Sequence, residues 1–576
     1  MKKSLILILL LVLFTPCVLA EKDTIKLLAL TESGGKRGVV VDLSLELKPG
    51  KERVFLETFP LTKIATQVSM RFAQQIACSE FDADCSGKDF FYTISAMPGI
   101  VGGPSAGAAS AVLAAALVKG FPVRKDVAIT GTINSGGVIG LVGGIDYKIK
   151  GAAKKNISLV LIPKGSRHYV SDGKTIDLVA LGKSVDIDVV EVATLEEAFE
   201  YFTNTTVIHS NESIVLDPKY VYTMKAVALD LCKRNEDIQN LLVDLRKTRG
   251  KKSSNNENSA IEFTKKGKSA YNNNDFYSAA SFCFRSNVML KREYFSLKEY
   301  SKEEIKDAVK TIREKIDKLD SAVSNSSIDT ISDLQAFMAV KERLSEAGHT
   351  LTKAENTADS TDASNILAYA EERYYSSVAW AKFFGLEGKR FHINQEKLKE
   401  SCTSKISEAE ERYNYVKSFL KADLSQTRNE LDDAYTEMNN HDYVMCLFKA
   451  AKAKSEIDVI LSAVGVSKDR VQEYIDLKLD IARFALFKSY KKDVFPMIGY
   501  SYYEYAKSLK NTDHYASLLF SEYALEFSTL DIYFTRAKTP SWSVDKESLF
   551  AFLTGIFIGI FILVIVLPAS RFKGKK

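Results

Sequence analysis

The 576-residue sequence lacks the short motifs that identify several classes of enzyme. It contains no Cys-x-x-Cys pair and no cluster of Cys and His at metal-ligand spacing, so we expect no metal site. It also lacks the G-x-x-x-x-G-K-[ST] loop that cradles nucleotide phosphates in P-loop motors. No other pattern indicates a bound group, and we therefore expect a protein without a cofactor.

An excess of charge of one sign is also absent. The chain carries 78 basic and 73 acidic residues, which leaves a net charge of only +5. No domain-wide basic face is indicated, so nucleic acid is not an expected partner. The hydrophobic content of 46% is typical of folded protein, and the length predicts two or more domains.

Apolar runs at both ends predict membrane-targeting segments. Residues 1–20 have two lysines, an apolar run and small residues before Ala20, which favours a cleaved signal peptide over an uncleaved anchor. Residues 549–567 are uncharged and long enough to cross a bilayer as one helix. The basic tail, residues 568–576, then places the C-terminus in the cytoplasm and the catalytic part outside it, in a single-pass cell-membrane protein. A G-x-x-x-G pair in the span leaves a homo-oligomer open.

Six cysteines remain after the signal segment. Only Cys78 and Cys85 are close together, and we expect them to clip a loop by a disulfide in an oxidising compartment. The other four, Cys232, Cys283, Cys402 and Cys446, stand at positions typical of helix interiors. We expect those four to be buried free thiols.

The composition changes near residue 215. Before it, short apolar runs such as "GVVVDLSLEL" and "SLVLIP" alternate with helical stretches, which predicts an α/β (α+β) domain over residues 21–210. After it, residues 215–540 read as all-helical. Stretches from Ser269, Asp433 and Glu504, with a degenerate fourth from Ala368, resemble tetratricopeptide-type hairpins, although an ordinary helical bundle fits equally.

The stretch "GGPSAG" places Ser105 in a Gly-rich turn before an Ala-rich helix. "GPSAG" also fits the nucleophile elbow of α/β-hydrolases, but that motif needs a strand before the serine and a histidine base. A loop precedes Ser105, and only His168 and His209 follow in the domain. A lysine can replace the histidine if burial lowers its pKa, and Lys148 in "GGIDYKIKG" is the best candidate.

The stretch from Gly102 to Gly165 resembles the proteolytic domain of Lon-type serine–lysine peptidases, and the likeness covers about residues 25–202. In that family a "GPSAG" serine and a "GG-x-x-x-K" lysine form the catalytic dyad. The resemblance implies that Ser105 is the nucleophile and Lys148, 43 positions later, its base. It also implies that Thr130 holds the lysine. Amides at the helix start would bind the oxyanion, and Gly102 or Gly103 would let the backbone approach.

The chain departs from the family pattern at Gly102 and Thr132, where acidic residues are usual. It resembles archaeal membrane-anchored Lon-like proteases, which have no ATPase module. We therefore expect an ATP-independent endopeptidase that cuts unfolded or membrane-adjacent peptides and proteins. The alternative is a catalytically inactive membrane scaffold that binds partners through its helical region.

Overall fold

The computed structural model describes residues 21–31, 37–59, 64–95, 103–171, 174–207, 218–249, 255–386, 388–419, 423–465 and 470–534. Several predictions lie outside these residues: the signal peptide (1–20), the membrane span (549–567), the basic tail (568–576), Gly102 and His209. Within the described ranges, no helix is both long and apolar enough to cross a membrane.

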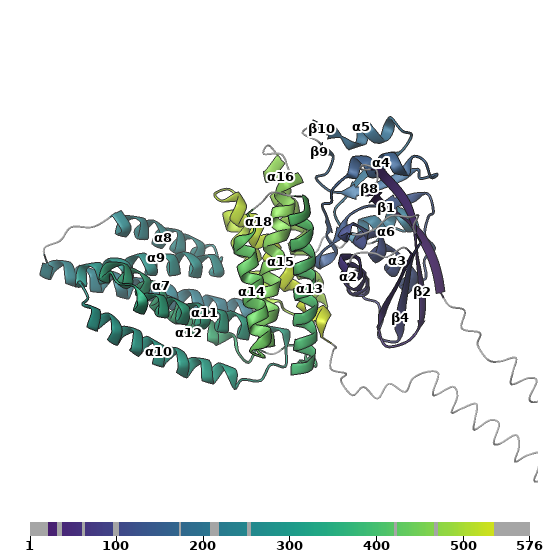
Figure 1. The fold of residues 1–576 in the computed structure, drawn as a ribbon. Coiled ribbons are helices and arrows are strands. Elements are labelled where there is room, and N and C mark those ends of the chain that lie inside the picture. Colours follow the sequence, from purple (N-terminus) through teal and green to yellow (C-terminus); the bar gives the residue numbers. More distant parts are fainter. Residues whose placement is uncertain are drawn as a thin grey trace, which may run out of the picture. The chain divides into compact units, whose positions relative to one another are not determined.

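A seven-stranded sheet forms the centre of the N-terminal region, in the order β11-β8-β5-β1-β2-β4-β3 (Figure 1). The strands are β1 (Glu21–Thr31), β2 (Arg37–Pro49), β3 (Val54–Phe59), β4 (Lys88–Ser95), β5 (Val127–Ile129), β8 (Leu159–Pro163) and β11 (Asp188–Val192). The half from β1 to β11 is parallel, whereas β2 runs antiparallel to both β1 and β4. Two small hairpins, β6 (Thr132–Ile133) with β7 (Ile139–Gly140) and β9 (His168–Ser171) with β10 (Lys174–Asp177), stand outside it.

Helices cover both faces of this sheet because successive strand residues point to opposite sides. On β1, Leu27 packs with α2 (Ile64–Glu80), α3 (Gly107–Lys119) and α6 (Leu195–Thr203). Its neighbour Leu28 packs on the other side with α4 (Ile145–Ala152) and α5 (Leu178–Lys183). The α/β architecture predicted for this region is confirmed.

Helix α3 is buried from Gly107 to Leu117, with apolar residues all round. Such a helix is stable only inside a core, and its many alanines let α2 and the sheet approach closely. The Ala-rich stretch after Ser105 is therefore the central packing element of the domain.

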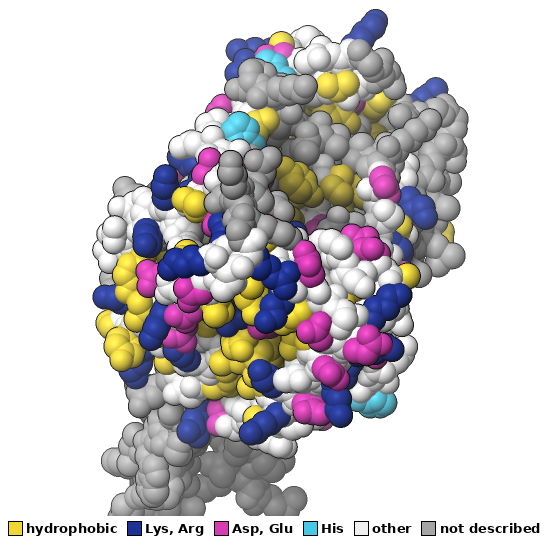
Figure 2. Space-filling model, turned by 90° about the vertical axis from the view of Figure 1, so that its left-hand side faces the viewer, with side chains coloured by type: hydrophobic (Ala, Val, Ile, Leu, Met, Phe, Trp, Pro, Cys, Tyr) yellow, Lys and Arg dark blue, Asp and Glu magenta, His cyan; other side chains and the backbone are white. Residues whose placement is uncertain are grey.

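From Pro218 onward the described chain is helical apart from short turns, as predicted. Its helices are α7 (Pro218–Arg249), α8 (Asn255–Asn272), α9 (Phe276–Lys298), α10 (Lys302–Ser324), α11 (Ile331–Asn356), α12 (Ser360–Trp380), α13 (Gln395–Phe419), α14 (Ser425–Asn439), α15 (Tyr443–Gly465), α16 (Val471–Lys491), α17 (Met497–Leu509) and α18 (His514–Ser528). Figure 2 shows basic and acidic side chains interspersed over one face of the molecule, with small apolar patches between them.

Three of the four repeat-like stretches form helix–turn–helix pairs: α8 with α9, α14 with α15, and α17 with α18. In the last two pairs the turn aspartate caps the second helix, Asp442 accepting from Met445 N and Asp513 from Ala516 N. The prediction of a fourth hairpin from Ala368 is wrong. That stretch lies within the continuous helix α12, because it has no Gly or Asp turn to end a helix.

Disulfides join all six described cysteines. Cys78, near the end of α2, pairs with Cys85. The expectation of four free thiols is wrong, since Cys232 pairs with Cys283 and Cys402 with Cys446. These bonds tie α7 to α9 and α13 to α15, whose Cα atoms at the cysteines are 5.0 and 5.7 Å apart. Packed neighbouring helices bring together cysteines that are 51 and 44 residues apart in sequence.

Candidate active site

Ser105 lies in a single 3-10 turn, Pro104–Ala106, that runs directly into α3. Gly103 precedes the turn with φ 129° and ψ 165°, a conformation that a residue with a Cβ rarely adopts. Among the residues that the structure describes, none lies within 4 Å of a Cβ placed on Gly103. Ser105 itself is half-buried, and such partial exposure suits a nucleophile that must meet a substrate carbonyl.

Two backbone hydrogen bonds tie this turn to the end of β5. Gly131 N donates to Ser105 O at 3.2 Å, and Ala108 N donates to Gly131 O at 3.1 Å. Gly131 directly follows Thr130, whose own N–H donates to Leu161 O on β8 at 3.1 Å. The serine turn is thereby fixed against the parallel half of the sheet.

Lys148 lies on α4, which begins after Gly144 in the left-handed conformation (φ 65°). The side chain is only 3% exposed, and its Nζ donates to Thr130 Oγ1 at 3.0 Å. Burial lowers the pKa of this amine from the ordinary lysine value to about 7. A large share of the amine is therefore neutral near pH 7 and able to accept a proton.

Thr130 and Gly131 thus connect the two halves of the predicted dyad. Thr130 holds the lysine amine, and the adjacent Gly131 holds the backbone of Ser105. Among the described residues, no hydrogen bond joins Ser105 Oγ to Lys148 Nζ. The structure therefore attaches Ser105 and Lys148 to the same two residues, Thr130 and Gly131. The serine hydroxyl does not contact the lysine amine directly in this conformation.

The start of the α3 helix offers donors for an oxyanion. Pro104 has no N–H, and the amides of Ser105 and Ala106 lie in the first turn, where no intrahelical carbonyl can accept from them. The Gly103 N–H instead donates to Thr66 Oγ1 on α2 at 3.4 Å. Gly103 therefore serves the site through its backbone shape, while the amides of Ser105 and Ala106 supply the positive end of the helical segment.

Sequence reasoning missed two glycines that seat α4. A Cβ at Gly38 would lie 1.9 Å from Tyr147 O, and one at Gly151 would lie 2.5 Å from Gly38 O. Strand β2 and helix α4 are therefore in direct backbone contact beside Lys148. The only sign of this contact in the sequence is that both positions are glycine. The sequence alone does not distinguish these two glycines from the others.

Of the two histidines considered as the base of a hydrolase elbow, only His168 lies within the described ranges. His168 is exposed on the separate β9–β10 hairpin, and His209 lies beyond the described ranges. Thr132, one of the two departures from the family pattern, is buried on β6, with its hydroxyl 3.4 Å from Asn134 Oδ1.

The segment that carries Ser105, Thr130 and Lys148 matches a known family. Residues 28–198 match the family model described as the Lon protease (S16) C-terminal proteolytic domain. These residues form a Lon-type proteolytic domain. The resemblance expected from the "GPSAG" and "GG-x-x-x-K" stretches is confirmed at this level.

Curated relatives of the Lon-type domain are themselves named Lon proteases. The Lon protease of Neorickettsia sennetsu is 29% identical over 182 residues, which is 30% of this chain and 20% of the relative. That of Fervidobacterium nodosum is 27% identical over 179 residues, covering 31% and 21%. The peroxisomal Lon protease homolog 2 of Danio rerio is 36% identical over 95 residues, covering 16% and 11%. The chain thus spans about a tenth to a fifth of these relatives. The match to the family model ends at residue 198, before the helical region begins.

Proposed function

We propose that the chain is a membrane-anchored serine endopeptidase that works outside the cytoplasm without ATP, with Ser105 as nucleophile and Lys148 as its base. The observation that carries this proposal is the buried Lys148 amine, held at 3.0 Å on Thr130 Oγ1 with a pKa lowered to about 7 by burial. A Lon-type domain implies serine peptidase chemistry, and this amine supplies the base that such chemistry needs.

The reaction begins when a substrate carbonyl approaches the Ser105 hydroxyl at the Pro104–Ala106 turn. Rotation of the Ser105 hydroxyl toward Nζ lets neutral Lys148 accept its proton while Oγ attacks the carbonyl carbon. The amides of Ser105 and Ala106, in the turn that leads into α3, stabilise the oxyanion that develops, an effect commonly worth about 3 kcal/mol per donor. The resulting ammonium donates its proton to the leaving amine, and water then hydrolyses the acyl-enzyme with Lys148 again as base.

The location and the energy source are proposed on separate grounds. The apolar runs at residues 1–20 and 549–567 support anchoring and export. Three disulfides in the described residues support an oxidising compartment. The sequence has no P-loop motif to supply unfolding work, so the substrates are peptides, loose segments or unfolded chains.

Digestion of an unfolded substrate tests this function. The full chain, purified in detergent, is expected to fragment casein without any nucleotide while leaving a tightly folded protein intact, because an unaided site admits only extended backbone. Fragments are followed by mass spectrometry. If casein and a peptide library stay intact from neutral to mildly alkaline pH, the peptidase proposal fails and the scaffold alternative gains support.

A further inference from the structure

Helix α13, from the helical region, lies against the catalytic elements of the Lon-type domain. It packs on α2 and on the Pro104–Ala106 turn that contains Ser105. The helical region therefore reaches the turn that contains the serine, although the two are far apart along the chain. The polar contacts that α13 makes there show what this packing accomplishes.

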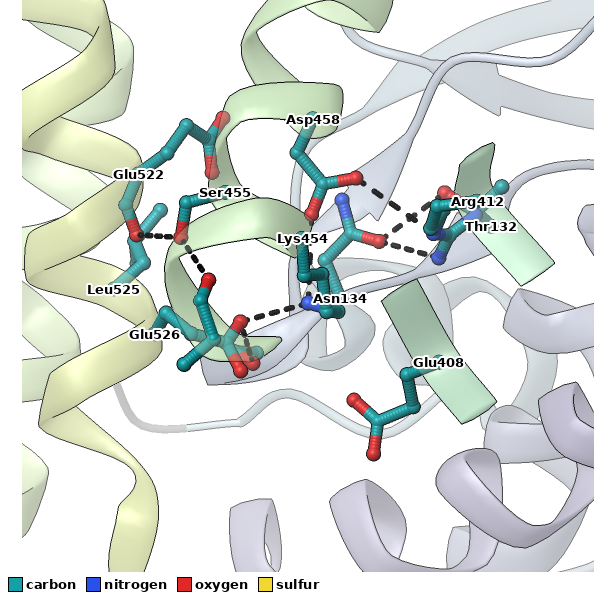
Figure 3. Close-up of polar contacts among 12 residues, drawn as sticks. Thr132, Asn134, Glu408, Arg412, Lys454, Ser455, Asp458, Glu522, Leu525 and Glu526 are labelled. Carbon is teal, nitrogen blue, oxygen red and sulfur yellow. Dashed lines mark hydrogen bonds and ion pairs between the residues drawn. The ribbon is translucent and has the colours of Figure 1, made fainter. Parts of the chain in front are cut away.

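Arg412 on α13 binds the segment that follows Thr130. Its Nη2 donates to Ile133 O at 2.9 Å and to Asn134 Oδ1 at 2.6 Å, and the residue is only 3% exposed (Figure 3). Ile133 and Asn134 stand three and four residues after Thr130, in and just after the short strand β6. Arg412 therefore fixes the segment that follows Thr130, the residue that accepts the hydrogen bond from Lys148.

Tyr415, three residues further along the same face of α13, binds the segment that precedes Lys148. Gly143 N donates to Tyr415 Oη at 2.8 Å, and Gly144 N donates to Tyr169 Oη at 2.7 Å. Gly144 O in turn accepts from Lys148 N at 3.1 Å. Two half-buried phenols thus fix the start of the helix that carries the base.

Buried charges behind α13 hold Arg412 in its place. Asp458 on α15 lies 3.6 Å from its Nε, and Lys454 lies 3.4 Å from Asp458 and 2.7 Å from Glu526 on α18. Glu526 also accepts from Ser135 Oγ at 2.7 Å. The 133–135 segment is therefore bound by side chains from α13 and α18, which charged residues of α15 connect to each other. Figure 3 shows part of this network.

We propose that Arg412 and Tyr415 are positioning residues, which hold the Thr130 and Lys148 segments in the register that proton transfer from Ser105 requires. The inference rests on the proposed function, and it makes the helical region a part of the active site instead of only a surface that presents substrates. The physical reason is geometric: displacing a reacting group by about 1 Å costs about 100-fold in rate. Without Tyr415 Oη, the half-buried Gly143 N–H loses its protein partner and the start of α4 is free to shift.

Single substitutions in the full chain test this role. Tyr415→Phe removes one oxygen, and Arg412→Gln removes the guanidinium. Tyr523→Phe and Arg343→Gln are matched controls, because Tyr523 donates to Glu456 at 3.2 Å and Arg343 to Ala339 O at 2.6 Å within the helical region. We expect kcat on casein-derived peptides to fall about 10- to 100-fold for the two α13 variants, with KM changed less than about twofold. The controls are expected to retain wild-type kcat, and Arg412→Lys, which keeps one donor, an intermediate value.

A general loss of folding would lower the amount of active protein for test and control variants alike, so each kcat is normalised to Ser105 sites titrated with a fluorophosphonate. The inference is overturned if Tyr415→Phe retains the kcat of Tyr523→Phe while the wild type is active. A wild-type chain that neither cleaves peptides nor reacts with the fluorophosphonate overturns the proposed function, and the inference with it.

Discussion

A chain carrying Ser105→Ala is expected to hydrolyse casein about 10⁶-fold more slowly than the wild type, and Lys148→Met is expected to lose a similar factor. The serine supplies the only bond to the substrate, and without the neutral amine its hydroxyl is not activated. Because the two groups act as a unit, the double variant is expected to be no slower than either single variant. Initial rates of peptide hydrolysis measure all three.

Lys154→Met is the matched control for the lysine, because Lys154 is exposed just beyond α4 and outside the site. It is expected to keep the wild-type rate. Retention of more than about a tenth of the activity by Lys148→Met would contradict the assignment of the base, since a general base contributes at least about 100-fold. Losses that multiply in the double variant would show that the two residues do not act together.

Removal of the half-buried ammonium of Lys488, by Lys488→Met on α16, is expected to lower the free energy of unfolding by about 3–5 kcal/mol, because the side chains of its partners Glu80 and Glu196 are only 5% and 3% exposed. Lys488 Nζ lies 2.5 Å from Glu80 Oε2 on α2 and also binds Glu196 on α6. Burial and the Glu80 carboxylate raise the pKa of Glu196 to about 7, while the Lys488 ammonium keeps the pKa of Glu80 low despite its burial. The substitution therefore strands an ionised carboxylate between the helical region and the Lon-type domain.

Urea unfolding of the full chain in detergent measures this loss. Lys491→Met, three residues further along α16 at an exposed position, is the control and is expected to change the free energy by less than about 0.5 kcal/mol. Equal unfolding free energies for the two variants would show that the Lys488 contacts contribute nothing to the docking of the two regions.

The parts of the fold that follow from local pattern were predictable. The strands β2, β4, β5, β8 and β11 each coincide with a run of β-branched and aromatic residues, and α2 and α3 with helical stretches. Strand β3 and the β9–β10 hairpin were missed, because they are short and partly exposed and so have no continuous apolar run. The stretch 246–259 is polar and therefore typical of a loop, yet α7 continues to Arg249 and α8 begins at Asn255.

The residues of the candidate site also fall into a group that local sequence motifs identify and a group that they do not. Ser105, Thr130 and Lys148 could be named because they stand in short stretches whose spacing is characteristic of one family. Arg412 and Tyr415 could not, since 278 residues separate Arg412 from Asn134 and 272 separate Tyr415 from Gly143. A buried Arg or Tyr in an amphipathic helix has no local sign of what it touches. The Cys232–Cys283 and Cys402–Cys446 disulfides could not be predicted for the same reason, because only the packing of helices brings these cysteines together.

The most direct test of the Ser105–Lys148 assignment is the pH dependence of covalent labelling at Ser105. The full chain is treated with a fluorophosphonate at a series of pH values, and the modified peptide is quantified by mass spectrometry. Because only the neutral amine accepts the serine proton, the labelling rate is expected to rise with pH through a midpoint near 7 and then level off. In Lys148→Met this rise is expected to disappear. An adduct on a residue other than Ser105, or a midpoint near the ordinary lysine value of 10.5, would contradict the dyad.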